Sequence, residues 1–136
     1  MIIRISLMIL CALCFKANAL VVISDIDDTI RKTDTLSPIA LKKVLHSDVP
    51  AFQGVRSFFW DIYHSRSGAR FYYVTNSFKE IYSADAWLKL SHFPYGEVYQ
   101  RDHGAVEDKS VKKNIEENYK IKTITSIIQD NQLSEE

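Results

Sequence analysis

The segment Val21–Ile30 constrains the fold more than any other feature of this chain, because an apolar run leads directly into three carboxylates. Such a run is typical of a strand buried in a parallel sheet. Asp25, Asp27 and Asp28 follow at the carboxyl end of this strand, where open α/β sheets bind their ligands. Alternation along the strand predicts that Asp25 and Asp27 point the same way, with Ile26 turned to the core.

Two carboxylates this close repel each other, so one takes up a proton unless a cation neutralises the pair. A hard ion that prefers oxygen ligands, such as Mg²⁺, suits them. The alternative is an acidic turn that only caps the next helix. A bare pair of aspartates would not decide between the two, but the added Asp28 and Thr29 behind a buried strand favour the metal site.

Residues 1–19 have the pattern of a secretory signal peptide: Arg4, an apolar run over residues 5–15, and a small-x-small sequence at residues 17–19. The alternative is an uncleaved N-terminal anchor, although the apolar run is short for a membrane span. Cleavage after Ala19 predicts a secreted protein, periplasmic or extracellular. The length then allows one domain, residues 20–136.

Cleavage would also change the composition of the chain. It removes Arg4, Lys16 and both cysteines, which leaves 15 basic and 17 acidic residues and no thiol. This balance does not indicate a nucleic-acid partner. Without thiols in an oxidising compartment, the domain depends on its hydrophobic core for stability.

Strands and helices alternate along the remaining chain, which favours an α/β domain with a parallel sheet. We expect four strands, at residues 20–25, 70–75, 97–101 and 122–128, and helices at residues 38–46, 78–91 and 108–119. A further helix between the first two strands has the spacing of a buried face. Its members are Val55, Phe58, Phe59, Ile62 and Tyr63.

Each expected strand ends in polar residues. Parallel strands bring their carboxyl ends to one edge of the sheet, so these residues are expected to converge there. Acids, hydroxyls and a lysine at one edge are what a site for phosphate and metal needs. The strand ends carry Asp25 and Asp27, then Thr75–Ser77, then Arg101 and Asp102, and finally Asp130 and Asn131.

These segments resemble the haloacid dehalogenase superfamily of phosphohydrolases, and within it the catalytic domain of the actin-patch-type phosphatidate phosphatases and their bacterial relatives. Asp25–Thr33 is similar to their motif I, with a second aspartate where the related lipin family has glycine. Phe71–Ser77 is similar to the strand with motif II. Phe93–Gly96 followed by Gln100–Asp102 resembles the next turn and strand, and Lys109 stands where the motif III lysine would fall.

The resemblance implies a Rossmannoid three-layer sandwich with a mainly parallel sheet. The intervals from Asp25 to Thr75 and from Thr75 to Lys109 leave no room for a large cap domain, so the site is expected to be open. The superfamily core has a fifth strand, whereas the sequence ends soon after the expected fourth. The domain is therefore expected to lack that strand, as a minimal or a truncated version.

The resemblance also implies roles for individual residues. Asp25 would be the nucleophile, and Asp27 the general acid and base. Mg²⁺ would be held by Asp25, the backbone carbonyl of Asp27 and Asp130. Thr75 would donate a hydrogen bond to the phosphoryl group, and Lys109 would neutralise its charge. The alternatives are that Thr75 only caps a helix and that Lys109 is solvated.

The expected function is a secreted, Mg²⁺-dependent phosphomonoesterase, with phosphatidate or another membrane lipid phosphate as the substrate class that the resemblance implies. Gln129 replaces the glycine that usually precedes the last motif aspartate, and the chain ends early. A truncated, non-catalytic domain that binds phosphate and metal is therefore the alternative. A phosphotransferase or nucleotidase on the same scaffold also stays open, as does the oligomeric state.

Overall fold

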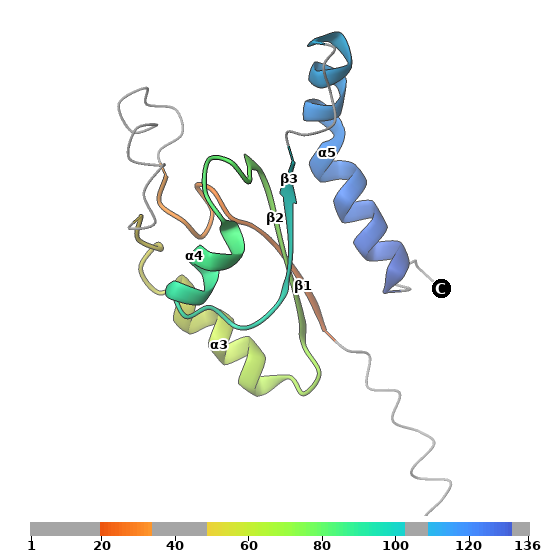
Figure 1. Cartoon of the computed structure of the whole chain (residues 1–136). Coiled ribbons are helices and arrows are strands. Elements are labelled where there is room, and N and C mark those ends of the chain that lie inside the picture. The colour runs from red at the N-terminus through yellow and green to blue at the C-terminus, as the bar shows by residue number, and fades with distance from the viewer. Residues whose placement is uncertain (1–19, 34–48, 103–108, 132–136) are drawn as a thin grey trace, which may run out of the picture.

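The computed structural model describes residues 20–33, 49–102 and 109–131, and within the last range it describes side chains from residue 118 onward. Three parallel strands form an open sheet in the order β1-β2-β3. Helices lie on both faces of this sheet (Figure 1). In chain order the elements are β1 (Val21–Asp25), α3 (Val55–Ser65), β2 (Arg70–Phe78), α4 (Ala84–Leu90), β3 (Glu97–Arg101) and α5 (Lys109–Asp130).

The central strand β2 holds the sheet together. Aromatic and β-branched residues fill it, and residues 71–75 are buried, as expected for a strand covered on both faces. Its register aligns Val74 with Asp25 of β1 and Thr75 with Gln100 of β3. The carboxyl ends of all three strands therefore meet at one edge of the sheet, as the sequence predicted.

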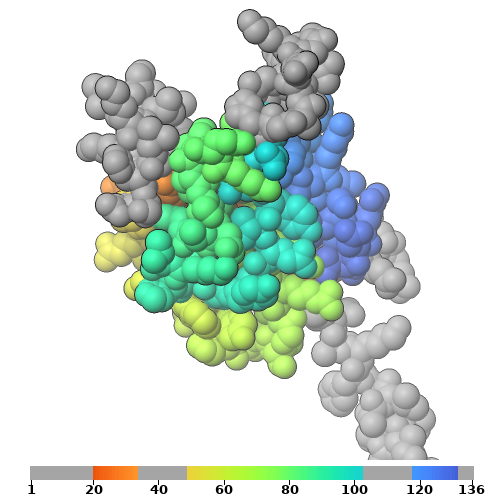
Figure 2. All heavy atoms as spheres, in the orientation of Figure 1, coloured from red at the N-terminus to blue at the C-terminus, as the bar shows by residue number. Residues whose placement is uncertain are grey.

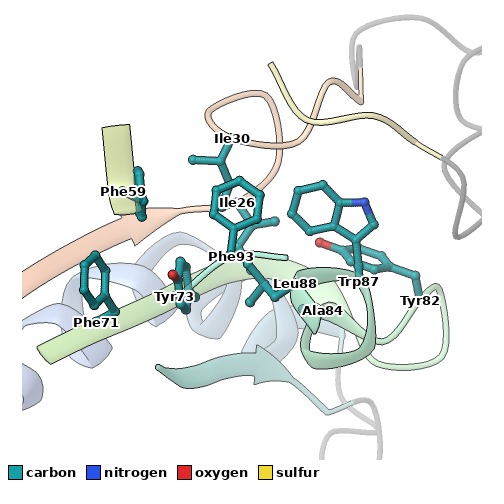
Figure 3. Close-up of a cluster of buried hydrophobic side chains, with 10 residues drawn as sticks. All are labelled: Ile26, Ile30, Phe59, Phe71, Tyr73, Tyr82, Ala84, Trp87, Leu88 and Phe93. Atoms are coloured by element: carbon teal, nitrogen blue, oxygen red, sulfur yellow. The ribbon is translucent and has the colours of Figure 1, made fainter. Parts of the chain in front are cut away.

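The first face of the sheet carries the larger core. Phe71 and Tyr73 of β2 project into it and pack with Phe59 of α3, and Trp87 of α4 packs on Phe93 in the same core (Figure 3). The Phe59 ring stacks on that of Tyr73 with 6.1 Å between centroids, which adds a specific aromatic contact to the burial of apolar area. The remaining buried members are Ile26, Ile30, Tyr82, Ala84 and Leu88.

Helix α5 covers the second face. Tyr72 and Val74, the alternate residues of β2, pack there against Ile127, which is 1% exposed. Asn131 follows the last residue of α5. Its side-chain amide nitrogen donates to the Ile127 carbonyl, and its side-chain oxygen accepts from Arg70 of β2. In the space-filling view α4 and β3 cover the face toward the reader, with α5 beside them (Figure 2). The described residues thus form three layers.

The prediction of a fourth strand at residues 122–128 is wrong, because these residues belong to α5. Residues 119, 123 and 127 share one helical stripe, and Tyr119 and Ile127 of this stripe pack against the sheet. The β-branched composition of this segment favours a strand, but burial against the apolar second face outweighs that preference. The expected end of the helix at residue 119 is wrong for the same reason.

The other elements differ from expectation mainly at their ends. β2 continues to Phe78 through an irregular pairing with β3, so α4 begins at Ala84 rather than at residue 78. Ser83 caps α4 by accepting a hydrogen bond from the Ala86 amide. In α3 the predicted apolar face is only partly buried, since Phe58 is 60% exposed.

Two predictions fall outside the described residues: the signal peptide at residues 1–19 and the helix at residues 38–46. Across the ranges that the structure describes, no helix combines the length and the apolar character needed to cross a membrane.

Candidate active site

A tight turn after β1 positions the acidic residues. Ile26 is fully buried, and its carbonyl accepts hydrogen bonds from the amides of Ile30 and Arg31 at 3.0 and 2.9 Å. Asp28 takes a left-handed conformation with φ 58°, which non-glycine residues adopt rarely. The Thr33 hydroxyl stabilises this conformation, because it accepts from the Asp28 amide and donates to the Asp28 carboxylate. The turn therefore orients the side chains on either side of Ile26.

Asp25, the last residue of β1, is about one-third exposed and is more accessible than Asp27. Its Oδ2 accepts from the Thr29 hydroxyl at 3.0 Å, and its Oδ1 accepts from the Lys120 ammonium at 2.6 Å. Lys120 lies in α5, so a helix on the second face supplies a cation to the carboxyl edge of the sheet. This charge-assisted bond joins α5 to the end of β1.

Asp27 is more enclosed, with 12% of its side chain exposed. Its Oδ2 accepts from the hydroxyls of Thr75 and Ser77 at 2.6 and 2.7 Å. Arg31 Nη1 donates to Oδ1 at 3.1 Å, and the Tyr82 hydroxyl lies 3.0–3.1 Å from both oxygens. The side chains that surround this carboxylate come from the turn after β1, from β2 and from the segment before α4.

The Arg31 side chain is fully buried, which is costly for a charge unless it is paired. The ion pair with Asp27 provides that compensation. The guanidinium also lies 3.8 Å from the centroid of the Tyr82 ring and 5.8 Å from that of Trp87, distances at which a cation is attracted to an aromatic face. Burial, with the negative charge of Asp27, raises the pKa of the Tyr82 hydroxyl and keeps it protonated.

The structure brings together three of the predicted site residues, Asp25, Asp27 and Thr75. Lys109 begins α5, but its side chain lies outside the described part of the chain. Asp130 is exposed at the other end of α5, where the adjacent Asn131 bonds to Arg70 at the start of β2. It therefore lies at the opposite edge of the sheet from Asp25.

Sequence reasoning assigned no role to five residues that bond to the two aspartates: Thr29, Arg31, Ser77, Tyr82 and Lys120. The first three lie inside the segments that carry the family resemblance, so closer attention to those segments would have found them. Lys120 was hidden because its segment was assigned to the end of a helix and the start of a strand. Tyr82 follows no spacing rule, and only the path of the chain after β2 brings it to Asp27.

The oxygen donors at this edge are the type that Mg²⁺ prefers, and this ion is commonly held by one or two carboxylates with water completing its shell. Asp25 offers a partly exposed carboxylate, and the backbone carbonyl of Asp27 follows two residues later in the chain. Among the residues that the structure describes, no three acidic, histidine or cysteine side chains gather as a metal site. Of the three predicted metal ligands, Asp25 and Asp27 therefore lie at this edge of the sheet and Asp130 does not.

The fold and the site together define a class of protein: an open α/β domain with two neighbouring carboxylates, hydroxyls and a lysine at the carboxyl edge of its parallel sheet. Residues 20–134 match the family model described as the catalytic domain of phosphatidate phosphatase APP1. The chain belongs to this family, and it is therefore a phosphatase of the phosphatidate phosphatase type. Neither the curated proteins nor the solved structures include a significant match.

Proposed function

We propose that the protein is an Mg²⁺-dependent phosphomonoesterase that works through an aspartyl-phosphate intermediate. The observation that carries the proposal is the pair Asp25 and Asp27 at the carboxyl edge of the sheet, one accessible beside Lys120 and the other held by hydroxyl donors. This arrangement separates an attacking carboxylate from a proton-transfer carboxyl, as a two-step phosphoryl transfer requires.

In the first step Asp25 attacks the phosphorus, and the bond from phosphorus to the ester oxygen breaks. Asp27, in its protonated form, gives its proton to this leaving oxygen. In the second step water attacks the phosphorus of the aspartyl phosphate, the bond from phosphorus to the Asp25 oxygen breaks, and Asp27 takes the proton from that water. Phosphate leaves, and both carboxyl groups return to their starting state.

Lys120 and Thr75 are suited to the charge that develops on the phosphoryl oxygens. Lys120 already lies 2.6 Å from the Asp25 carboxylate, so an entering phosphoryl group would meet its positive charge. The Thr75 hydroxyl donates to Asp27 in this structure and can rotate to a phosphoryl oxygen instead. Donors placed where negative charge develops stabilise the transition state more than the ground state.

Asp25 and the backbone carbonyl of Asp27 are the residues that would hold Mg²⁺ in this proposal. The bound ion would offset the repulsion between the carboxylate and the phosphoryl group. The hard oxygen character of these donors supports the assignment. The nearby Lys120 supplies part of the same neutralisation from the protein itself.

Phosphatidate or another membrane lipid phosphate is the proposed substrate, and the family match supports it. We also propose that the protein acts after export, in the periplasm or outside the cell, because residues 1–19 have the sequence of a signal peptide. The assignment to the haloacid dehalogenase superfamily rests on the resemblance of the motif segments and belongs to this proposal.

The test is phosphate release by the purified chain from a soluble aryl phosphate and from phosphatidate in mixed micelles, each with Mg²⁺ and with chelator. Asp25→Asn should abolish turnover on both substrates. Asp61→Asn, the same change at an exposed position of α3, should leave it unchanged. Wild-type protein that is folded and inactive on both substrates would favour the alternative, a non-catalytic domain that binds phosphate and metal.

A further inference from the structure

Arg31 and Tyr82 approach the Asp27 carboxylate from inside the protein. Arg31 is fully buried and Tyr82 is 8% exposed. The Tyr82 ring lies beside Trp87 in the larger core (Figure 3). Both residues donate hydrogen bonds to a carboxylate that is itself mostly enclosed, so they contact the side of the Asp27 carboxylate that faces the core.

Tyr82 is anchored at its backbone as well as at its ring. The Gln100 amide of β3 donates to the Tyr82 carbonyl at 2.7 Å, and the Gln100 side-chain oxygen accepts from the Ala84 amide. The segment before α4 is thereby tied to β3 at the carboxyl edge of the sheet. The guanidinium of Arg31 over the ring fixes the remaining freedom of the phenol.

The hydroxyls of Thr75 and Ser77 differ from these two donors. A hydroxyl carries one proton, so Thr75 stops donating to Asp27 when it donates to a phosphoryl oxygen. Asp27 then loses the shortest of its hydrogen bonds at the moment when its position matters for proton transfer. Arg31 and Tyr82 lie on the core side and keep their contacts with the carboxylate.

We propose that Arg31 and Tyr82 are positioning residues that hold the Asp27 carboxylate in place for proton transfer to the leaving oxygen. The inference rests on the proposed phosphatase function. Neither residue touches the substrate in it, and each acts through Asp27. Misplacement of a general acid slows the cleavage of poor leaving groups most, because good leaving groups depart with little help from a proton.

The experiment measures kcat/KM, which covers the steps through phosphoryl transfer to Asp25, with short-chain phosphatidate and with para-nitrophenyl phosphate. Tyr82→Phe should lower kcat/KM about tenfold for the alkyl ester and about twofold for the aryl ester. The loss should appear in kcat, with KM for phosphatidate within about twofold of wild type.

The matched control is Tyr73→Phe. Tyr73 is buried in the same core, and its hydroxyl donates to the Pro94 carbonyl rather than to Asp27. Both variants lose one buried phenolic hydrogen bond, so a purely structural effect would appear equally in both. For the second donor, Arg31→Lys should retain more of the alkyl-ester activity than Arg31→Met, because it keeps the charge beside Asp27.

Equal ratios of alkyl to aryl activity in wild type, Tyr82→Phe and Tyr73→Phe would overturn the inference, and Tyr82→Phe decides this even if the Arg31 variants fail to fold. An inactive wild-type chain would overturn the proposed function and the inference with it. That outcome is distinct, because it appears before any variant is measured.

Discussion

Lys120 and Asp25 are 95 positions apart in the chain, and the Lys120 ammonium lies 2.6 Å from the Asp25 carboxylate. One residue ends a strand and the other lies in the helix that covers the second face of the sheet. The contact couples the packing of α5 to the charge of the site. A change that displaces the helix should therefore affect activity as well as stability.

Lys120→Ala should lower kcat/KM for phosphate release about 100-fold, the usual loss when one fixed donor to a developing charge is removed. Lys122→Ala, at an exposed position of the same helix, is the control and should retain wild-type activity. Lys109→Ala completes the set, because Lys109 is the lysine that the motif spacing suggested. Full loss in Lys109→Ala with none in Lys120→Ala would contradict the role proposed for Lys120.

The left-handed conformation of Asp28 predicts an unusual order of tolerance. Asp28→Gly removes the hydrogen bond from the Thr33 hydroxyl to the Asp28 carboxylate but suits φ 58°, so it should cost less than about 1 kcal/mol in the free energy of unfolding. Asp28→Val loses the same bond and disfavours this φ, so it should cost about 2 kcal/mol. Urea denaturation of both variants checks the order, and equal losses would show that φ does not matter.

Gly96 lies so close to β2 that no side chain fits. A Cβ at this position would come within 2.5 Å of the Phe71 carbonyl oxygen and 2.7 Å of the Tyr73 ring. Gly96→Ala should therefore lower the free energy of unfolding by about 3 kcal/mol through overpacking.

Gly68→Ala is the matched comparison for Gly96→Ala. Gly68 has open space around it and only a positive φ of 82°, so the change should cost about 1 kcal/mol in the same denaturation experiment. If Gly68→Ala were the more damaging of the two, the close approach of Gly96 to β2 would be wrong.

The burial of Tyr73 predicts a loss of stability at high pH. Burial raises the pKa of its hydroxyl above the ordinary value of 10.0, so the neutral form is favoured in the folded state. Its contribution to stability is complete below pH 10 and declines above it, because only the unfolded chain then releases this proton. Tyr73→Phe should weaken the fall of the melting temperature between about pH 9 and 11. An unchanged slope would show that Tyr73 ionises normally when folded.

The sequence predicted the part of the fold in which local pattern and tertiary environment agree. The apolar run before Asp25, the strand rich in aromatic residues that contains Thr75, and the strand at residues 97–101 all formed as expected, since buried parallel strands have a strong local signature. The convergence of Asp25, Asp27 and Thr75 followed from the rule that parallel strands end at one edge.

The segment at residues 122–128 shows where that reasoning failed. Its isoleucines and threonines favour a strand locally, yet Ile127 is buried as part of a helix because the second face of the sheet needed an apolar cover. Because this segment is helical, Asp130 lies away from the site and Lys120 contacts Asp25. No local pattern specifies which of these two residues reaches the carboxyl edge.

The sequence by itself determined the chemistry that the protein carries, because the acids and hydroxyls stand at strand ends whatever covers the sheet. Only the tertiary structure decided which groups surround each acid. Tyr82 and Lys120 meet their aspartates through contacts between segments far apart in the sequence, whereas Arg31 lies four residues from Asp27 and is buried beside it. A buried charge or phenol finds its partner only when the layers pack.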